Sequence, residues 1–347
     1  MKCDICNPTT KIYTIYFADN QRIEPLLTYF SSYPKTDWHM INDRMFWTLE
    51  PIFFDLMDYV HAHLDASAIY AVESDPHDPL RELYKMKPIL EFQAEREASW
   101  IDELIQKKAI QTHFQPIVKI TDGHVSIVGN ELLSRGLDEH QDIISPYHLF
   151  EAARKRNRLF ALDRLCRLES IQNAVPVADK LIFINFIPTA IYVPEHCLST
   201  TFAAIKKVGI KPEQVVFEVV ETDKIEDMSH LLAILDYYRS QGIKYALDDV
   251  GTGFNDLDLL SRMEPDYVKL AREYTDGVST DPEKWQVAKT VMDMAHQVGA
   301  LALAEGVEQV QDVECLMEMG YDLYQGYLFA KPSDTPLQAI DSQWKQT

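Results

Sequence analysis

The sequence predicts an α/β protein in which a small α/β domain precedes a closed (β/α)8 barrel. From residue 109 onward, short apolar runs that resemble strands alternate with amphipathic helical segments, which is typical of a parallel sheet buried on both faces. Eight such runs within roughly 230 residues fit a closed barrel better than an open sheet. Glycine, which caps helices in the left-handed conformation at little cost, follows several helical segments, at Gly209, Gly242, Gly299 and Gly320.

The composition fits two globular domains that do not bind nucleic-acid polymers. With 347 residues the chain is too long for one ordinary domain, and 46% apolar residues are ample for packed cores. The 33 basic and 54 acidic side chains give a formal net charge of 33 − 54 = −21. Non-specific binding of DNA or RNA needs a basic surface, so we expect neither as a partner. A small anionic ligand would need cations at its site, and a metal is the obvious candidate.

The cysteines and the apolar runs predict a reduced, soluble, cytoplasmic protein. An odd number of cysteines at scattered positions is not a disulfide framework; they are Cys3, Cys6, Cys166, Cys197 and Cys315. No apolar run reaches 18 residues, so we expect no membrane contact. Cys3 and Cys6 form a CxxC pair, which is compatible with half of a zinc site or, since no second pair follows at suitable spacing, with reduced thiols.

Residues 1–88 are predicted to form the small α/β domain, to which we assign a sensory or regulatory role. Strand-like and helix-like stretches alternate there, beginning with a strand, at residues 11–17, 20–33, 37–49, 52–64 and 67–74. The turn-like stretch ESDPHDP then closes the domain. An aromatic cluster is compatible with either a core or a ligand pocket, and comprises Trp38, Phe46, Trp47, Phe53 and Phe54.

Residues 89–108 are predicted to form a linker helix. Leu90, Ala94, Ala98, Ile101 and Ile105 share one face of such a helix, and charged residues occupy the others. The helix either lies on the following domain, residues 109–347, or pairs with a second subunit and carries a signal.

The predicted barrel strands end on polar, mostly acidic residues. The strands are expected at residues 112–118, 124–131, 181–186, 215–221, 245–250, 266–270, 300–308 and 322–330. Their ends carry Gln115, Glu131, Asn185, Glu218 with Glu221, Asp248 with Asp249, Lys269, Glu305 with Glu308, and Gln325. The C-terminal ends of parallel barrel strands converge on one mouth, where the chemistry lies. One such residue fits a salt bridge or a helix cap, but eight converging ends do not fit a purely structural role.

The clustered carboxylates predict a metal site. Carboxylates that lie close together raise each other's pKa unless cations neutralise them. Carboxylate, amide and water oxygens are the ligands of Mg²⁺ or Mn²⁺. Two such ions roughly 3.5–4 Å apart form the usual clamp for in-line attack on a phosphodiester. Glu131, at the end of an apolar strand, is therefore expected to be a metal ligand.

A series of motifs in this part of the chain resembles a known family. FQPIV, NELLSR, FINF, FEVVETD, ALDDVGTGFNDL, DYVKL, LAEGVE and YQGYLFAKP match, in order and spacing, the EAL domain of bacterial cyclic-di-GMP phosphodiesterases. The match spans about residues 109–335. The resemblance implies a modified (β/α)8 barrel with one antiparallel strand, two divalent metals per site, a homodimer, and hydrolysis of cyclic di-GMP to linear pGpG.

The resemblance also implies a role for each matching residue. Ligands of one metal are Glu131, Asn185, Glu218 and Asp248, and ligands of the other are Asp248, Asp249 and Glu308. Lys269 and Glu305 orient or deprotonate the attacking water, and with Glu131 they form the catalytic set. Gln325 is a hydrogen-bonding support in the substrate site, and Gln115 and Arg135 contact the substrate. Glu221, Gly251 and Gly253 support the loop DDVGTGFNDL.

The chain departs from the family pattern at several positions. Where the family has Lys-Ile-Asp, the chain reads Lys269-Leu270-Ala271, so one acidic residue is missing. With one anionic neighbour fewer beside two metals, the pKa of Lys269 is expected to be lowered. Leu133 replaces the alanine of the family's name tripeptide, Asp312 stands at a usual glutamine position, and the loop carries Val250, Phe254, Asn255 and Asp256.

These departures leave alternatives to an active phosphodiesterase. Ala271 favours a degenerate EAL domain that binds cyclic di-GMP as a receptor without substantial turnover. An EAL domain that serves only as a protein-interaction module is a third possibility. The intact set of clustered carboxylates disfavours it, because an interaction surface has no need for them.

Overall fold

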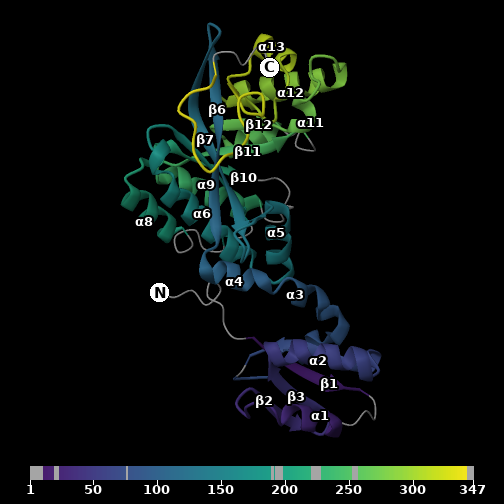
Figure 1. Cartoon of the computed structure of the whole chain (residues 1–347). Helices are drawn as coiled ribbons and strands as arrows, with labels where there is room; N and C mark the ends of the chain where they lie inside the picture. Colours follow the sequence, from purple (N-terminus) through teal and green to yellow (C-terminus); the bar gives the residue numbers. More distant parts are fainter. Residues whose placement is uncertain are drawn as a thin grey trace. The chain divides into compact units, whose positions relative to one another are not determined.

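The computed structural model describes residues 11–18, 23–75, 77–188, 191, 198–219, 228–251 and 257–341. Its chain divides into two compact units (Figure 1). One comprises Met1–Gln106 with Phe150–Arg158, and the other comprises Lys107–Leu149 with Leu159–Thr347.

The N-terminal unit contains a five-stranded antiparallel sheet in the order β2-β3-β1-β4-β5. The strands are β1 (Ile12–Phe17), β2 (Trp38–Asn42), β3 (Met45–Leu49), β4 (Ile69–Ser74) and β5 (Lys87–Pro88), and the first helices are α1 (Glu24–Phe30) and α2 (Glu50–His63). The chain order β1-α1-β2-β3-α2-β4 is that of a ferredoxin-like fold. Helix α2 begins with Pro51 in its first turn, where the missing N–H is not needed.

Four members of the aromatic cluster belong to the core of this unit, namely Trp38, Phe46, Phe53 and Phe54. Phe46 and Phe53 are fully buried. The ring of Phe53 stacks on Tyr13 with centroids 4.1 Å apart, and that of Trp38 stacks on Phe30 at 5.1 Å. Of the two roles left open for this cluster, the described contacts favour the core.

The predicted continuous helix over residues 89–108 is wrong. Instead, a 3₁₀ turn (Ile89–Phe92) leads into two short helices, α3 (Gln93–Glu97) and α4 (Trp100–Lys107). This break rotates the apolar face, so Leu90 is 45% exposed while Phe92, Ile101 and Leu104 are buried. The tighter 3₁₀ turn does not keep the 3.6-residue period from which the face was predicted.

The second unit is the predicted barrel with one antiparallel strand. In the described residues its sheet runs in the order β6-β14-β13-β12-β11-β10-β9-β7-β8 and closes through pairing of β6 with β7. The strands are β6 (Ile110–Thr121), β7 (His124–Leu137), β8 (Ile143–Ile144), β9 (Leu181–Phe186), β10 (Val215–Val219), β11 (Lys244–Val250), β12 (Tyr267–Leu270), β13 (Leu301–Ala304) and β14 (Leu323–Tyr324). Strand β6 is antiparallel to both neighbours, and β7 and β9–β14 are parallel to one another.

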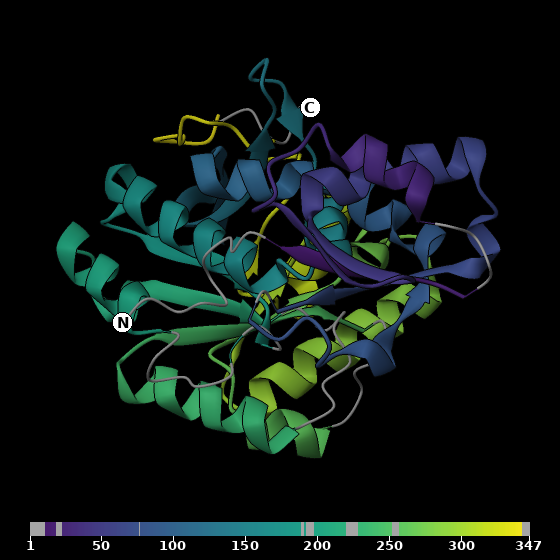
Figure 2. The same ribbon diagram turned by 90° about the horizontal axis from the view of Figure 1, so that it is seen from below.

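The antiparallel strand arises from a tight hairpin. Asp122 and Gly123 connect β6 to β7 with positive φ angles of 51° and 78°, as an Asp-Gly type I′ turn requires. The helices of this unit lie around the strands (Figure 2). They are α6 (Leu159–Asn173), α8 (Ser199–Val208), α9 (Met228–Ser240), α10 (Leu257–Met263), α11 (Arg272–Thr275), α12 (Pro282–Gln297) and α13 (Val310–Met319). Helix α5 (Pro146–Lys155) is divided between the units, because Phe150–Arg158 belong to the N-terminal one. The glycines expected to end helices have positive φ angles: Gly209, Gly242, Gly299 and Gly320.

The barrel interior has an apolar layer beneath a polar one. The apolar layer comprises Ile117, Phe183, Val216, Ala246, Tyr267, Leu303 and Leu323. Residues two apart on a strand point to the same side of the sheet, so each apolar residue directs a polar neighbour into the barrel. The polar partners, in the same order, are Gln115, Asn185, Glu218, Asp248, Lys269, Glu305 and Gln325.

Candidate active site

Lys269 lies at the centre of the polar layer. Its side chain is fully buried, and its Nζ is 2.8 Å from Glu218 and 3.0 Å from Asp248. Glu305 is 3.4 Å and Glu131 is 3.7 Å from the same Nζ. The structure therefore brings together one lysine and four of the predicted site carboxylates.

Hydrogen bonds from two amides hold Glu131 in place. Asn185 Nδ2 donates to one carboxylate oxygen at 2.7 Å, and Gln325 Nε2 donates to the other at 2.6 Å. The Gln325 amide also donates to Gln115 Oε1 at 3.2 Å, and Gln115 donates to the Ala330 carbonyl at 3.4 Å. Gln325 therefore fixes the orientation of Glu131, while its role in the substrate site stays a prediction.

Asp248 and Asp249 are neighbours on β11 that reach the same site, although consecutive residues of a regular strand point to opposite faces. The pairing of β11 with β12 shifts register between Leu247 and Val250, and Asp249 has a positive φ of 53°. A bulge re-aims side chains in this way, and an aspartate tolerates the left-handed conformation. Carboxylate oxygens of Asp248, Asp249 and Glu305 all lie within 4.8 Å of one another.

Burial and mutual repulsion keep several of these carboxyls hard to ionise. Burial, with a contribution from Glu131, raises the pKa of Glu218 well above its usual value. Burial likewise raises the pKa of Glu305 to about 8, although Lys269 opposes the shift. The pKa of Asp249 is raised by burial and by Asp248.

Lys269 and Glu131 are shifted toward their charged forms. Burial alone would lower the pKa of Lys269, but the surrounding carboxylates, led by Asp248 and Glu131, raise it well above the usual value. For Glu131, burial opposes ionisation, but Lys269 and the hydrogen bond from Gln325 outweigh it and lower its pKa. The pKa of Lys269 was expected to be lowered in a site that holds two metals. The protein's own groups, without metals, instead raise the pKa of Lys269.

The residues of the polar layer fit a pair of divalent cations. When ionised, the protein's own charges here sum to −5 + 1 = −4, from Glu131, Glu218, Asp248, Asp249, Glu305 and Lys269. Glu218 Oε1 and Glu305 Oε2 face the Lys269 ammonium, but Glu218 Oε2 is buried without a hydrogen-bond donor. Such an oxygen needs an explanation, and a hard cation supplies one.

The other predicted residues lie outside this cluster or outside the described part of the chain. The carboxylate of Glu308 binds Arg272 at 2.7 Å. Arg135 is half-buried on β7 and donates to the Ser134 carbonyl at 3.0 Å. Glu221 and Gly253 lie outside the described residues, as do Cys3, Cys6 and the loop positions 254–256. The roles proposed for all of these residues stay predictions.

Two departures from the family pattern have structural contacts. Ala271 is buried and caps α11, and its amide donates to the Val250 carbonyl at 3.1 Å. The side chain of Asp312 accepts hydrogen bonds from the amides of Gly277 and Ser279, each at 3.0 Å. Asp312 therefore fixes the loop between α11 and α12.

Sequence reasoning missed a buried ion pair behind β9. Asp163 on α6 pairs with Arg167 one turn later, and both side chains are almost fully buried. The Asp163 carboxylate accepts the amide of Ile187 at 3.0 Å, two residues beyond Asn185. The sequence contained a signal for this pair, because Asp163 and Arg167 are oppositely charged and four residues apart in a predicted helix.

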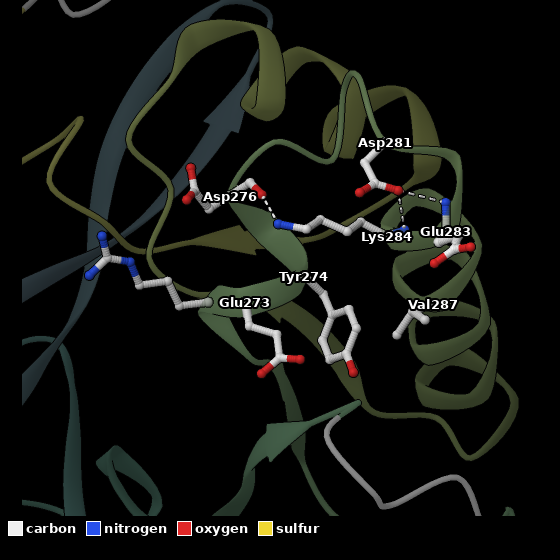
Figure 3. Close-up of a pocket in the computed structure, with 8 residues that line it drawn as sticks. Glu273, Tyr274, Asp276, Asp281, Glu283, Lys284 and Val287 are labelled. Atoms are coloured by element: carbon white, nitrogen blue, oxygen red, sulfur yellow. Dashed lines mark hydrogen bonds between the residues drawn. The ribbon is translucent and has the colours of Figure 1, made fainter.

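A cavity of about 870 Å³ is lined by residues of α11, of α12 and of the segment between them (Figure 3). Tyr274 and Val287 contribute its apolar surface, and most of the other residues that line it are charged. Lys284 donates to the Asp276 carbonyl at 2.6 Å, and Asp281 caps α12 through the amides of Glu283 and Lys284. Lys269 and its four carboxylates do not line this cavity, so it is distinct from the polar layer.

Two relatives match about two thirds of the chain. One relative is the probable cyclic di-GMP phosphodiesterase PdeG of Escherichia coli, 28% identical over 236 residues, or 66% of this chain and 45% of that protein. Another is the cyclic di-GMP phosphodiesterase RocR of Pseudomonas aeruginosa, 28% identical over 64% of this chain and 57% of RocR. The matched segments span less than two thirds of the length of these relatives.

Solved structures show the same barrel. A standalone EAL protein of Vibrio cholerae, described in its c-di-GMP bound form, is 30% identical with a TM-score of 0.60, over 69% of this chain and 98% of that one. In the described residues, no helix is both long and apolar enough to cross a membrane.

The model of the EAL domain family matches residues 98–332, which is most of the chain. The protein therefore belongs to the EAL domain family.

Proposed function

We propose that this protein hydrolyses cyclic di-GMP to linear pGpG with two divalent cations, Mg²⁺ or Mn²⁺. The observation that carries the proposal is the cluster of carboxylates around Lys269. The net negative charge of this cluster would repel a phosphate ligand unless metal ions neutralised it. The named relatives support the choice of substrate, since PdeG and RocR are described as cyclic di-GMP phosphodiesterases.

In this proposal the ligand set is divided between the two cations. Glu131, Asn185, Glu218 and Asp248 hold one cation, and Asp248, Asp249 and Glu308 hold the other. When bound, the cations supply a nucleophilic water and neutralise the phosphate. Asn185 and Gln325 keep Glu131 oriented, because they occupy one carboxylate oxygen each.

Lys269 and Glu305 act on the water in this proposal. The pKa of Glu305, raised by burial to about 8, makes this carboxyl a suitable proton acceptor near neutral pH. The water oxygen forms a bond to phosphorus, the bond to the 3′ oxygen breaks, and that oxygen takes up a proton. Gln115 and Arg135 contact the dinucleotide, for which the planar guanidinium of Arg135 suits a phosphate or a guanine edge.

A direct assay tests this function. The purified protein is incubated with cyclic di-GMP and Mg²⁺ or Mn²⁺, and pGpG is measured. Binding of cyclic di-GMP without pGpG would instead favour the receptor, the alternative that Ala271 motivates. Absence of both binding and hydrolysis would favour an interaction module.

We further propose that residues 1–88 regulate the domain at 109–347 through the segment 89–108, in a cytoplasmic homodimer. The support is the separate N-terminal fold and its own aromatic core. Deleting residues 1–88 should leave a folded barrel with altered turnover. Identical kinetics of the two forms under all conditions tested would remove the basis for this regulatory role.

A further inference from the structure

The amide that follows β9 is bound by a charged side chain from a helix. Strand β9 ends at Phe186, and Pro188 has no N–H to donate. Ile187 therefore carries the last amide of this strand end. It donates at 3.0 Å to the carboxylate of Asp163 on α6.

A buried ion pair holds that carboxylate in place. Its other oxygen accepts a hydrogen bond from Arg167, and the Nε of Arg167 donates to Thr201 Oγ1 on α8 at 3.1 Å. Asp163, Arg167 and Thr201 are 3%, 1% and 0% exposed. The acceptor of the Ile187 amide is thus fixed by groups on two helices and is shielded from water.

Stability alone does not require this pair. Two buried charges lose their hydration, and well-packed apolar side chains in their place are often equally stable or more stable. What the carboxylate provides is direction, since one oxygen binds the Arg167 guanidinium while the other binds the Ile187 amide. An apolar side chain at position 163 would leave this amide without that acceptor.

The amide held by Asp163 lies two residues beyond Asn185, which belongs to the polar layer. Asn185 is paired with Glu218 across β9 and β10, and its side-chain amide donates to Glu131 at 2.7 Å. A displaced end of β9 would therefore move the group that orients Glu131. Catalytic groups tolerate little misplacement, so such a shift should slow the reaction.

We propose that Asp163 is a positioning residue for the reaction, because it holds the end of β9 and thereby directs the side chain of Asn185 onto Glu131. The inference rests on the proposed function, in which Glu131 belongs to the catalytic set. The proposed substrate contacts Gln115 and Arg135 lie on β6 and β7. Loss of the Asp163 contact should therefore lower kcat and leave KM nearly unchanged.

Two double variants separate the hydrogen-bond acceptor from the ion pair. Asp163→Leu and Asp163→Asn are each combined with Arg167→Met, so that neither protein contains an uncompensated buried charge. Leucine and asparagine share the branched shape of aspartate, but only asparagine keeps an acceptor for the Ile187 amide. Arg164→Met is a matched control, since it removes an exposed hydrogen bond between the same two helices, from Arg164 Nε to Thr200 Oγ1 at 3.3 Å.

Proton–nitrogen NMR of the full chain in chelator tests the contact without turnover. In the Asp163→Leu double variant, the Ile187 amide should exchange with D₂O at least about tenfold faster than in the wild type, which corresponds to about 1.4 kcal/mol. The signals of the Asn185 side-chain amide should move as well. In the Asp163→Asn double variant and in Arg164→Met, both should stay close to the wild type.

The same proteins are then compared for production of pGpG at saturating Mn²⁺. The Asp163→Leu double variant should lose about tenfold in kcat, with KM nearly unchanged. The Asp163→Asn double variant and Arg164→Met should stay close to the wild type. When Asn185→Ala is already present, the Asp163→Leu change should cause no further loss, because the two changes act through one contact.

The proposal is overturned if the Asp163→Leu double variant keeps the wild-type kcat or the wild-type NMR signals. It is also overturned if the Asp163→Asn double variant loses as much, or if the loss persists beside Asn185→Ala. Absence of pGpG from the wild type would instead refute the proposed function, and the NMR signals would still show whether Asp163 holds Asn185 in place.

Discussion

Replacing Lys269 by methionine should destabilise the protein strongly, and more so at high pH. The change removes the buried cation that lies within 3.7 Å of Glu131, Glu218, Asp248 and Glu305. Removing one partner of a buried ion pair costs about 3–5 kcal/mol, because the remaining charge is left uncompensated. The carboxyls can partly escape by taking up protons, so the loss should shrink as the pH falls.

The assay is urea denaturation in the presence of a chelator, with the free energy of unfolding measured at pH 6 and above pH 8. A suitable control is Lys289→Met on α12, whose partner Asp293 is mostly exposed, and which should cost less than about 1 kcal/mol. If Lys269→Met lost no more stability above pH 8 than this control, the central place of Lys269 in the charge balance would be refuted.

Three further predictions concern pH, an unpaired amide and the missing acid. Since the pKa of Glu305 is raised to about 8, the native state retains protons that the unfolded state releases. The contribution of Glu305 to the free energy of unfolding should therefore fall as the pH rises from about 4.5 to 8. Glu305→Gln should flatten this part of the pH profile of unfolding in chelator, and an unchanged profile would contradict the assignment. Asn130 is fully buried, and neither polar atom of its side chain has a hydrogen-bond partner. Asn130→Val should raise the free energy of unfolding by about 1–2 kcal/mol, and a loss would show that the amide is satisfied. Ala271→Asp should raise the turnover rate with little change in substrate affinity; an unchanged or slower enzyme would mean that another acid, such as Glu273, already fills the role.

The polar layer was predictable from the sequence because strand geometry has a period of two. Phe183 and Asn185, or Tyr267 and Lys269, are two apart, so a buried apolar residue fixes the direction of the polar one. The order of the strands around a barrel then brings residues together that are far apart in the chain. The alternation along each strand and the topology of the barrel were therefore enough to predict that Lys269 and its carboxylates lie close together.

The contacts of Glu308 and Asp249 were not predictable in the same way. Glu308 binds Arg272 because α11 starts directly after Ala271 and because Gly306 leaves room for the arginine stem. Asp249 reaches the site through a shift in strand register and a positive φ, which no alternation pattern encodes. Both depend on backbone irregularity rather than on periodicity.

The prediction of a single helix over residues 89–108 was wrong for a related reason. Its apolar spacing fits one helix, but the chain forms a 3₁₀ turn and breaks again near Ala98 and Ser99. Tertiary packing of Phe92 and Ile101 overrides the weak local preference for a single helix.

The most direct test of the account compares wild type with Glu131→Gln in the cyclic di-GMP assay. Glutamine keeps the volume and the hydrogen-bonding capacity at this position but removes a charge that the proposed cation needs. The account predicts pGpG from the wild type with Mg²⁺ or Mn²⁺, none in excess chelator, and a loss of at least about two orders of magnitude in the variant. Normal turnover in Glu131→Gln, or undiminished wild-type activity in chelator, would contradict it.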